Sequence, residues 1–334
     1  MTNEAQKASD DRAQAPEREE ELEMLEKIKA VMIGHAVGDA LGVPVEFCKR
    51  DELAKDPVTD MRGYGTYPVP AGTWSDDTSM SIAALDSLAQ GKVDPDEIMG
   101  NFIEWVENGK YTSTGESFDI GRTCLQAIRA YWICHDPGEC GQAGEYSNGN
   151  GSLMRIHPFA LYAFFKGEPL DRSLDIMREG CMMTHAHPRS IYACGIYAMV
   201  LWKLLRGADK AKVMTELENA AELFDGIYPE ERDHYEWIFS NRFLSKNADE
   251  ISGSGYVVHT LEAALWCLLT TNSYRECVLK AVNLGEDTDT VAAVAGGLAG
   301  AMYGYDAIPI EWRNTLIRRE YIEEMCERAY RAWQ

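Results

Sequence analysis

Apolar side chains recur along most of the chain at the three- and four-residue spacing of amphipathic helices. The first run, from Leu22 to Met32, predicts that the folded body begins near residue 22. Turns marked by Gly, Pro and Asn separate the runs that follow. We expect further helices over residues 76–90, 95–108, 119–132, 153–166, 171–183, 189–206, 209–223, 230–241, 257–270, 273–282, 290–303 and 310–331.

Alternating patterns typical of strands are scarce. Only residues 64–69 and 256–258 could form short strands. No repeat and no internal linker interrupts the helical runs, so the sequence predicts an all-α fold with one domain over residues 23–334. Residues 1–22 are rich in Glu, Asp, Ala and Gln with almost no large apolar side chain, so we expect a flexible acidic arm.

The charge and cysteine content narrow the classes of function. The formal net charge of −22 repels nucleic acid phosphates and anionic lipids, so binding to nucleic acid or a membrane surface is not expected. The nine cysteines are odd in number and include no C-x-x-C pair, which indicates neither a disulfide framework nor a thiolate zinc site. A reducing cytoplasm fits best, since no secretory signal is visible and the most apolar segment, 291–303, is too short to cross a bilayer.

Paired carboxylates stand at two of the expected helix starts. They occur in Ser75-Asp76-Asp77-Thr78 and in Asp287-Thr288-Asp289-Thr290. One interpretation is helix capping, because Ser, Thr and Asp side chains accept hydrogen bonds from the first N–H groups of a helix. Capping needs one acceptor, however, and a second carboxylate adds repulsion. The pairs therefore favour a bound cation, and an all-oxygen ligand set suits Mg²⁺ or Mn²⁺.

The helix expected after the second pair contains three glycines within residues 291–300. Glycine inside a helix costs about 1 kcal/mol relative to alanine. We therefore expect a neighbouring element to approach this helix closely, which would place it at the centre of the fold.

Five short motifs follow one another along the chain. They are Gly38-Asp39-Ala40-Leu41-Gly42 with Pro44 and Glu46, Ser75-Asp76-Asp77-Thr78, Asn150-Gly151-Ser152-Leu153-Met154-Arg155, His185-Ala186-His187-Pro188 and Asp287-Thr288-Asp289-Thr290. Over about residues 34–304, their order and spacing resemble the ADP-ribosylglycohydrolase family, including the bacterial dinitrogenase-reductase-activating glycohydrolase and the ADP-ribosylarginine hydrolases. The resemblance implies an orthogonal all-α helical bundle around a binuclear metal site, which removes ADP-ribose from modified protein side chains.

The resemblance also implies roles for individual residues. Glu46 and Asp119 are the expected catalytic residues, and which of them acts as the general base stays open. The family more often has Thr at the position of Ser75, and a smaller polar residue at that of Arg122. Two Mg²⁺ or Mn²⁺ ions are expected on Ser75, Asp76, Asp77, Asp287, Asp289 and Thr290. ADP-ribose is expected to bind Asn150, Gly151, Ser152 and His187.

Several of these residues have plainer alternatives. Asp119 could be an ordinary helix N-cap, and Glu46 could be a surface carboxylate after a turn. His185 and His187 could form a metal pair, although no further ligand of matching type is evident, or they could complete a turn. The glycines around Asn150 offer backbone N–H groups to a diphosphate, as any tight turn would.

These assignments predict hydrolysis at the anomeric carbon of the distal ribose, through a transition state with oxocarbenium character. Arginine is the expected acceptor, because the segment around Asp119 resembles that of the arginine-directed bacterial enzymes. A second hypothesis concerns the arm, which could be a solvated tail without function; some family members, however, resemble immunity proteins whose N-terminal extension blocks an ADP-ribosyltransferase toxin. A third is a catalytically silent reader of ADP-ribose, against which the complete ligand set argues.

Overall fold

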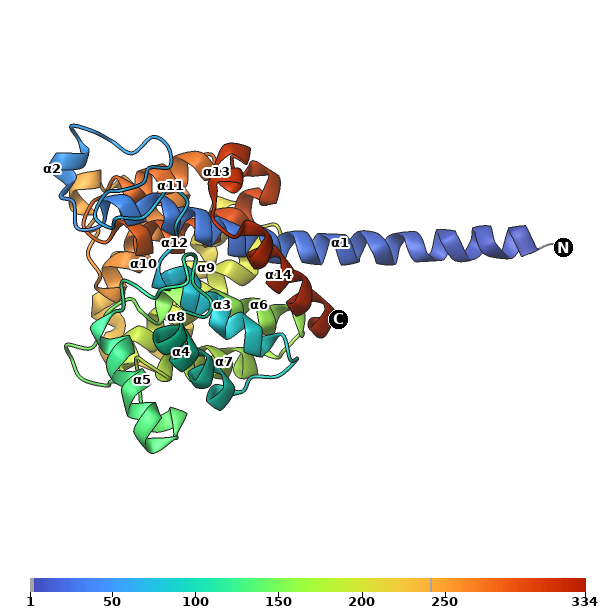
Figure 1. The fold of residues 1–334 in the computed structure, drawn as a ribbon, viewed down its shortest axis with the longest axis horizontal. Coiled ribbons are helices and arrows are strands. Elements are labelled where there is room, and N and C mark those ends of the chain that lie inside the picture. Colours follow the sequence, from blue (N-terminus) through green and yellow to red (C-terminus); the bar gives the residue numbers. More distant parts are fainter. Residues whose placement is uncertain (1–2, 241) are drawn as a thin grey trace.

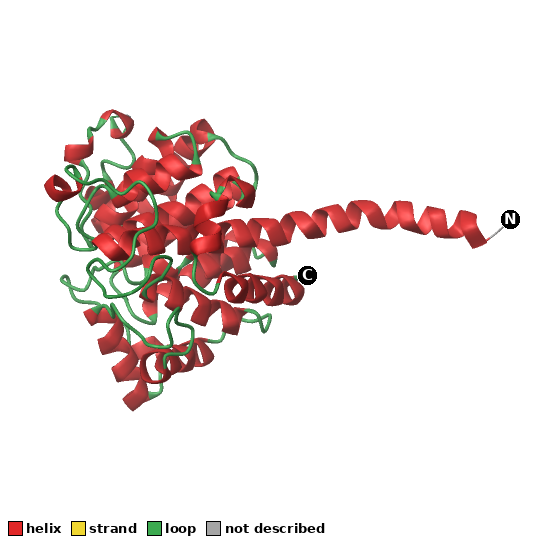
Figure 2. Ribbon diagram, turned by 45° about the horizontal axis from the view of Figure 1, so that its top comes forward, coloured by secondary structure: helices red, strands yellow, loops and turns green. Residues whose placement is uncertain are grey.

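The computed structural model describes residues 3–240 and 242–334, and the side chains of residues 22–240 and 242–334. Helices dominate this part of the chain (Figure 2). The α-helices are α1 (Asn3–Gly42), α2 (Arg50–Leu53), α3 (Asp76–Leu88), α4 (Pro95–Asn108), α5 (Arg122–Cys134), α6 (His157–Phe165), α7 (Leu170–Met182), α8 (Pro188–Leu205), α9 (Lys210–Asp225), α10 (Val257–Thr270), α11 (Tyr274–Val282), α12 (Thr288–Tyr303), α13 (Ile310–Thr315) and α14 (Arg319–Trp333).

Short 3-10 helices complete the regular structure. They are η1 (Val43–Val45), η2 (Pro137–Glu139), η3 (Leu153–Arg155), η4 (Pro229–Tyr235), η5 (Phe243–Ser245), η6 (Ala248–Glu250) and η7 (Tyr305–Ala307). The described residues contain no strand, only two isolated bridges, Gln142 to His185 and Gly149 to Tyr256. The predicted all-α class is confirmed, and neither strand candidate, 64–69 or 256–258, forms a strand.

Two helices rich in small residues, α1 and α12, form the centre of the fold (Figure 1). A Cβ atom built on Gly38 would lie 2.1 Å from the carbonyl oxygen of Ala292, and one on Gly300 would lie 2.0 Å from that of Ala30. Only glycine allows such an approach, so the predicted central position of the glycine-containing helix is confirmed. This packing brings the end of α1 against the start of α12, where the second carboxylate pair lies.

The other predicted helices agree with the structure to within about four residues, except at two places. The described part of range 230–241 contains η4 and turns where an α-helix was expected. Range 310–331 is divided into α13 and α14. Arg318 adopts a φ of 55° between them, and the N–H of Ile317 donates to the carbonyl oxygen of Gly72 (2.9 Å). Both expectations of a continuous helix were therefore wrong.

The first helix begins well outside the body, as Figure 1 shows. The side chains of residues 1–21 lie outside the described part of the structure, so the flexibility of the predicted arm 1–22 stays a prediction. The segment Leu22–Val45 is long and apolar enough to cross a membrane, but 94% of its most apolar window is buried inside the protein. A core helix passes the same test of length and composition, and its burial identifies it as one.

Candidate active site

A cavity of about 290 Å³ opens where the starts of α3, α5 and α12 meet. Its lining joins segments from both halves of the chain, including seven of the predicted site residues. The lining residues are Glu46, Phe47, Asp76, Asp119, Gly121, Arg122, Thr123, Cys124, Gly149, Asn150, Gly151, Met154, His185, Asp287 and Thr290.

The first carboxylate pair lies at the start of α3. Ser75 caps this helix, because its hydroxyl oxygen accepts a hydrogen bond from the N–H of Asp77 (3.4 Å). The same hydroxyl donates to Oδ2 of Asp77 (3.1 Å). Asp76 lines the cavity and Asp77 is fully buried. Since Ser75 serves as the cap, the capping interpretation does not explain either carboxylate.

Asp39 on α1 holds the start of α3 in place. Its carboxylate accepts hydrogen bonds from the N–H of Ser75 (2.9 Å), the N–H of Thr78 (3.1 Å) and the hydroxyl of Thr78 (2.6 Å). No role was predicted for Asp39 from its motif. The available signal was a carboxylate in an otherwise apolar helix, because a buried charge requires partners.

The second carboxylate pair lies at the start of α12 and faces the first. Asp287 makes no capping hydrogen bond with its side chain; its Oδ2 accepts instead from the amide of Asn150 (2.9 Å). Oδ1 of Asp289 accepts from the N–H of Thr290 (2.9 Å). The hydroxyl of Thr290 donates to Oδ2 of Asp77 (3.2 Å), which joins the two clusters directly.

The facing carboxylates are poorly compensated by the protein itself. Burial raises the pKa values of Asp76, Asp77 and Asp289 well above their usual range, and the charges of neighbouring carboxylates raise them further. One oxygen each of Glu46, Asp77 and Asp289 is buried without a hydrogen-bond partner. Such oxygens are costly unless a cation neutralises them, so the cluster fits divalent metal ions.

Two groups of carboxylates are close enough to share an ion, with ligand atoms in each group within 4.8 Å of one another. Asp289 belongs to both groups. The groups are Asp39 with Asp77 and Asp289, and Glu46 with Asp119 and Asp289. Within residues 22–240 and 242–334, no such group includes a histidine or a cysteine, so the H-x-H alternative is not supported. Oxygen ligands alone favour hard cations such as Mg²⁺ and Mn²⁺.

Glu46 and Asp119 lie together at the cavity wall. Glu46 is only 5% exposed, which excludes a surface carboxylate; burial, aided by the charge of Asp119, raises its pKa to about 9. The N-cap of α5 is Gly121, so the N-cap alternative for Asp119 is wrong. Asp119 instead precedes the helix with a φ of 57° and accepts a hydrogen bond from the hydroxyl of Tyr67 (2.8 Å). No motif marks Tyr67 in the sequence.

The Asn150 loop forms another part of the cavity lining. The backbone N–H of Asn150 donates to the carbonyl oxygen of Gly255 (3.0 Å), so this part of the expected diphosphate cradle is already occupied. The side-chain amide of Asn150 donates to Thr260 (3.0 Å) as well as to Asp287. Ser152 is buried behind the wall, where the thiol of Cys181 donates to its hydroxyl (3.2 Å), and it does not line the cavity.

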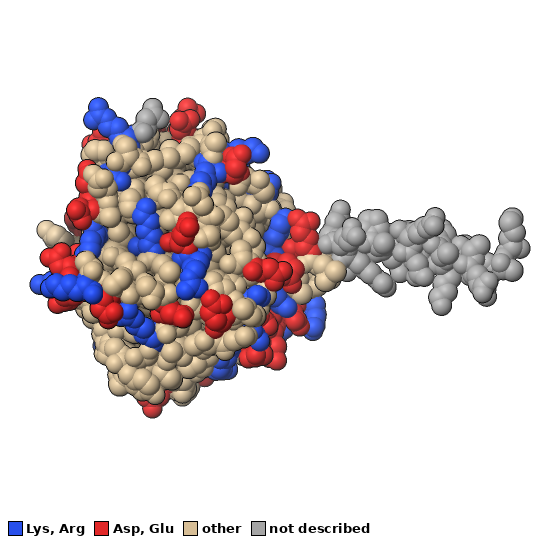
Figure 3. All heavy atoms as spheres, turned by 90° about the horizontal axis from the view of Figure 1, so that it is seen from above, with Lys and Arg blue, Asp and Glu red and all other residues tan. Residues whose placement is uncertain are grey.

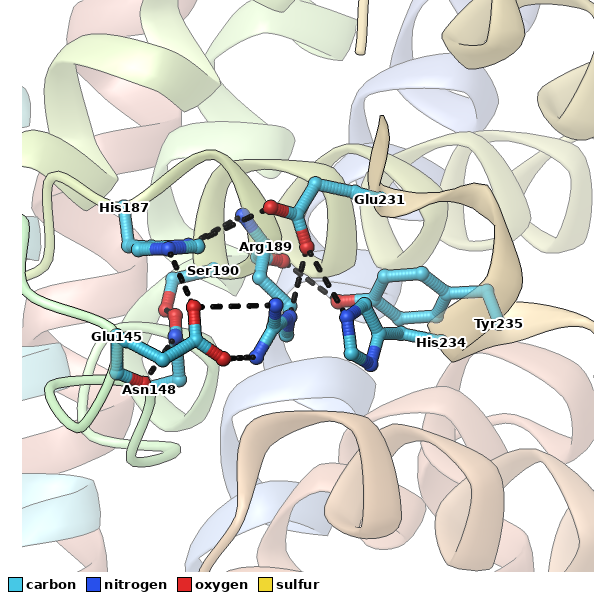
Figure 4. A network of polar contacts seen from close by, with 8 residues as sticks. All are labelled: Glu145, Asn148, His187, Arg189, Ser190, Glu231, His234 and Tyr235. Carbon is cyan, nitrogen blue, oxygen red and sulfur yellow. Dashed lines mark hydrogen bonds and ion pairs between the residues drawn. The ribbon is translucent and has the colours of Figure 1, made fainter. Parts of the chain in front are cut away.

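The two histidines of the fourth motif differ in position. His185 lines the cavity, whereas His187 caps α8 by accepting a hydrogen bond from the N–H of Arg189 (3.1 Å). Figure 4 shows the network beside it, in which Arg189 donates to Glu231 (2.7 Å) and Glu145 (2.8 Å). Residues of this network line a second hollow of about 500 Å³, and Gly149 lines both hollows. The predicted ligand contact of His187 stays a prediction.

Comparison with known proteins decides which family this site belongs to. The sequence model of the family described as ADP-ribosylglycohydrolase matches residues 20–334. The chain belongs to the ADP-ribosylglycohydrolase family. Its buried carboxylate clusters are consistent with a metal site typical of this family.

Relatives within the family include bacterial enzymes. ADP-ribosylarginine hydrolase Tri1 of Serratia proteamaculans is 32% identical over 311 residues, which cover 93% of this chain and 80% of that protein. ADP-ribosyl-(dinitrogen reductase) glycohydrolase of Rhodospirillum rubrum is 31% identical over 287 residues, covering 85% of this chain and 88% of that protein. A solved structure described as an ADP-ribosylglycohydrolase-related protein complex has a TM-score of 0.76 and 32% identity. The match covers 93% of this chain and 99% of the chain in that structure.

Proposed function

We propose that this chain hydrolyses the bond between ADP-ribose and an arginine side chain of a modified protein. The observation that carries the proposal is the cavity at which buried carboxylates from three helices converge with Glu46 and Asp119. Two relatives at 32% and 33% identity are ADP-ribosylarginine hydrolases, which supports arginine as the acceptor.

We propose that the metal centre consists of two Mg²⁺ or Mn²⁺ ions. The buried, unpartnered oxygens of Asp77 and Asp289 support this assignment. When bound, such ions orient sugar hydroxyls and lower the pKa of a water molecule. The proposed ligands are Ser75, Asp76, Asp77, Asp287, Asp289 and Thr290.

In this scheme Glu46 and Asp119 act at the reacting ribose from the same wall of the cavity. Bound cations would favour the ionised form of Glu46, which would then take a proton from water or from a ribose hydroxyl. Asp119, oriented by the hydroxyl of Tyr67, accepts hydrogen bonds from the guanidinium group of the acceptor. A planar guanidinium matches carboxylate geometry, and the surrounding negative charge stabilises positive charge on the ribose. The lining residues Asn150 and Gly151 are proposed to position the rest of ADP-ribose, together with His187, which lies outside the lining at the N-cap of α8.

The proposal is tested by release of free ADP-ribose from proteins modified on arginine or on serine. We expect release from arginine, its loss on chelation and its recovery with Mn²⁺. Asp77→Asn should lower the rate by about 100-fold, while Glu218→Gln, on the exposed face of α9, should leave it unchanged. Faster release from serine would refute arginine as the acceptor. An unchanged rate in the Asp77→Asn variant would refute the proposed metal centre.

A second proposed function is binding of an ADP-ribosyltransferase toxin through residues 1–22. The projection of α1 from the body supports it, because that half of the helix is available to a partner (Figure 1). Deleting residues 1–22 should then abolish binding of the transferase and leave hydrolysis intact. Unchanged binding after the deletion would reject this function without affecting the first.

We further propose that the protein acts in the cytoplasm. All nine cysteines are free, which suits a reducing compartment. Fractionation of the source cells tests this location directly.

A further inference from the structure

The turn after α5 brings two thiols into contact. The Sγ atoms of Cys134 and Cys140 lie 3.5 Å apart. Both thiols donate to the same acceptor, the carbonyl oxygen of Asp136, at 3.6 Å and 3.0 Å respectively. The sulfur atoms of a disulfide are about 2.05 Å apart, so the bond could form if the two atoms approached by about 1.5 Å.

The two thiols differ in their access to solvent. Cys134 is the one exposed cysteine of the nine, Cys48 is half-buried, and Cys140 and the other six are buried. Burial, together with the hydrogen bond between its thiol and that of Cys134, raises the pKa of Cys140 to about 12. A dissolved oxidant therefore reacts with Cys134 first, while Cys140 stays a protonated thiol beside it.

The pair joins the far end of α5, whose N-terminal end lines the active-site cavity, to the segment that leads to Gln142. The N-terminal end of α5 supplies Arg122, Thr123 and Cys124 to the lining. Two residues after Cys140, the N–H of Gln142 donates to the carbonyl oxygen of Thr184 (3.0 Å), next to His185 in the lining. A bond between the thiols would close a short ring that fixes the far end of α5 to this segment.

We propose that Cys134 and Cys140 are a modification site that hydrogen peroxide converts to a reversible intramolecular disulfide. Peroxide oxidises the thiolate of Cys134 to a sulfenic acid and is reduced to water. The sulfur of Cys140 then attacks the sulfenic sulfur, the S–S bond forms, and the sulfenic oxygen leaves as a second water with the thiol proton. Two thiols and one peroxide thus give one disulfide and two waters, and a dithiol reductant reverses the change. Reversible disulfides of this kind are compatible with a cytosolic protein.

The test treats the full-length chain with hydrogen peroxide and counts free thiols under denaturing conditions. We expect two of the nine thiols to be lost, a mass decrease of two hydrogens, a peptide cross-link between Cys134 and Cys140, and full recovery with dithiothreitol. Hydrogen exchange of amides 132–142 should slow after oxidation, because the ring restricts local opening. The matched control is Cys48→Ser, which removes the half-buried cysteine and should still lose two thiols.

Two further variants separate the roles of the thiols. Cys140→Ser should accumulate a sulfenic acid at Cys134 that dimedone labels, whereas the wild type should show little label. Cys134→Ser should keep its thiols at the same dose. The proposal is overturned if Cys134→Ser loses the same pair of thiols, or if the wild type forms no cross-link. The wild-type measurement stands even if a substitution at buried Cys140 impairs folding.

Discussion

The carboxylates around the cavity have different neighbours, and these neighbours separate groups that hold the fold from groups available to a ligand. Asp39 is occupied by hydrogen bonds from α3. Asp77 and Asp289 each keep one buried oxygen without a partner. Similar side chains within one cluster thus have different uses, which residue type alone cannot distinguish.

Replacing Asp39 by asparagine should destabilise the fold. The N–H of Ser75 lies within 3.1 Å of both carboxylate oxygens of Asp39, so in Asp39→Asn the amide N–H₂ faces this buried donor in either orientation. We expect the free energy of unfolding to fall by about 2 kcal/mol, measured by urea denaturation. Thr78→Val removes only the hydroxyl donor and should cost about 1 kcal/mol. An equal loss in the two variants would contradict the conclusion that Asp39 holds the start of α3 through hydrogen bonds with both Ser75 and Thr78.

Replacing Asp77 by asparagine should have opposite effects with and without metal. In a chelator the substitution removes one charge from a crowded anionic cluster, so the free energy of unfolding should rise by about 1 kcal/mol. Mn²⁺ should then raise the melting temperature of the wild type much more than that of Asp77→Asn, since binding to the native state stabilises it. Equal stabilisation of both proteins by Mn²⁺ would exclude Asp77 as a ligand.

The sequence could predict the carboxylate clusters because doubled charges at a helix start have no purely structural use. It could not predict Tyr67, which reaches Asp119 from a loop without regular spacing. It also could not show that the Asn150 N–H is already bonded to Gly255. Both contacts join residues far apart along the chain, and local patterns carry no information about them.

At the scale of the elements, the close packing of α1 against α12 places the two acidic helix starts together. The predicted close approach to α12 followed from the cost of glycine in a helix. The break between α13 and α14 could not be predicted in this way. It depends on Gly72, whose added Cβ would lie 1.9 Å from the carbonyl oxygen of Thr315.

Gly38→Ala should destabilise the α1–α12 contact. The added Cβ would meet the carbonyl oxygen of Ala292 at 2.1 Å, so α12 must shift. We expect a loss of about 3 kcal/mol in the free energy of unfolding, together with weaker Mn²⁺ binding measured by calorimetry. Gly100→Ala on α4 is the matched control, because its Cβ meets nothing within 4 Å, and it should stabilise the protein by up to about 1 kcal/mol. Similar losses in both variants would contradict the packing argument.

At the scale of the whole molecule, the formal net charge is −22. Acidic and basic side chains are interspersed on the face drawn in Figure 3. Inside the protein, buried carboxylates gather at the cavity, and two buried histidines lie elsewhere in the core. The ring centroids of His35 and His157 lie 4.2 Å apart, with the rings tilted by 35°, and both residues are buried. Acid should therefore lower the stability of the protein mainly by protonating these buried histidines.

His157 should make the protein less stable in mild acid. Burial lowers its pKa well below the ordinary 6.5, and the charge of His35 lowers it further. The folded state therefore excludes a proton that the unfolded state binds below pH 6.5, and stability is lost as the pH falls. Between pH 7 and pH 5 this residue should cost about 2 kcal/mol.

The measurement is the difference in that pH dependence between the wild type and His157→Leu, taken from urea denaturation. The acidic cluster is common to both proteins and cancels in the comparison. The two curves should converge toward acid, with the wild type losing more stability. Parallel curves would show that His157 is readily protonated in the folded protein.

Along the first helix, we expect the projecting N-terminal part to tolerate changes of sequence, whereas the buried C-terminal part is constrained by packing. Leu22 is 62% exposed, whereas Ile28 is fully buried, so the transition takes less than two turns. The backbone of α1 projects from the body at its N-terminal end (Figure 1), so we expect fusions, extensions or partner-specific sequences to be exchangeable there. Beyond Ile28, α1 leads to Asp39 beneath the active site. In the evolution of this protein, new binding partners could thus be acquired at the N-terminal end of α1, while its C-terminal end is constrained by the active site.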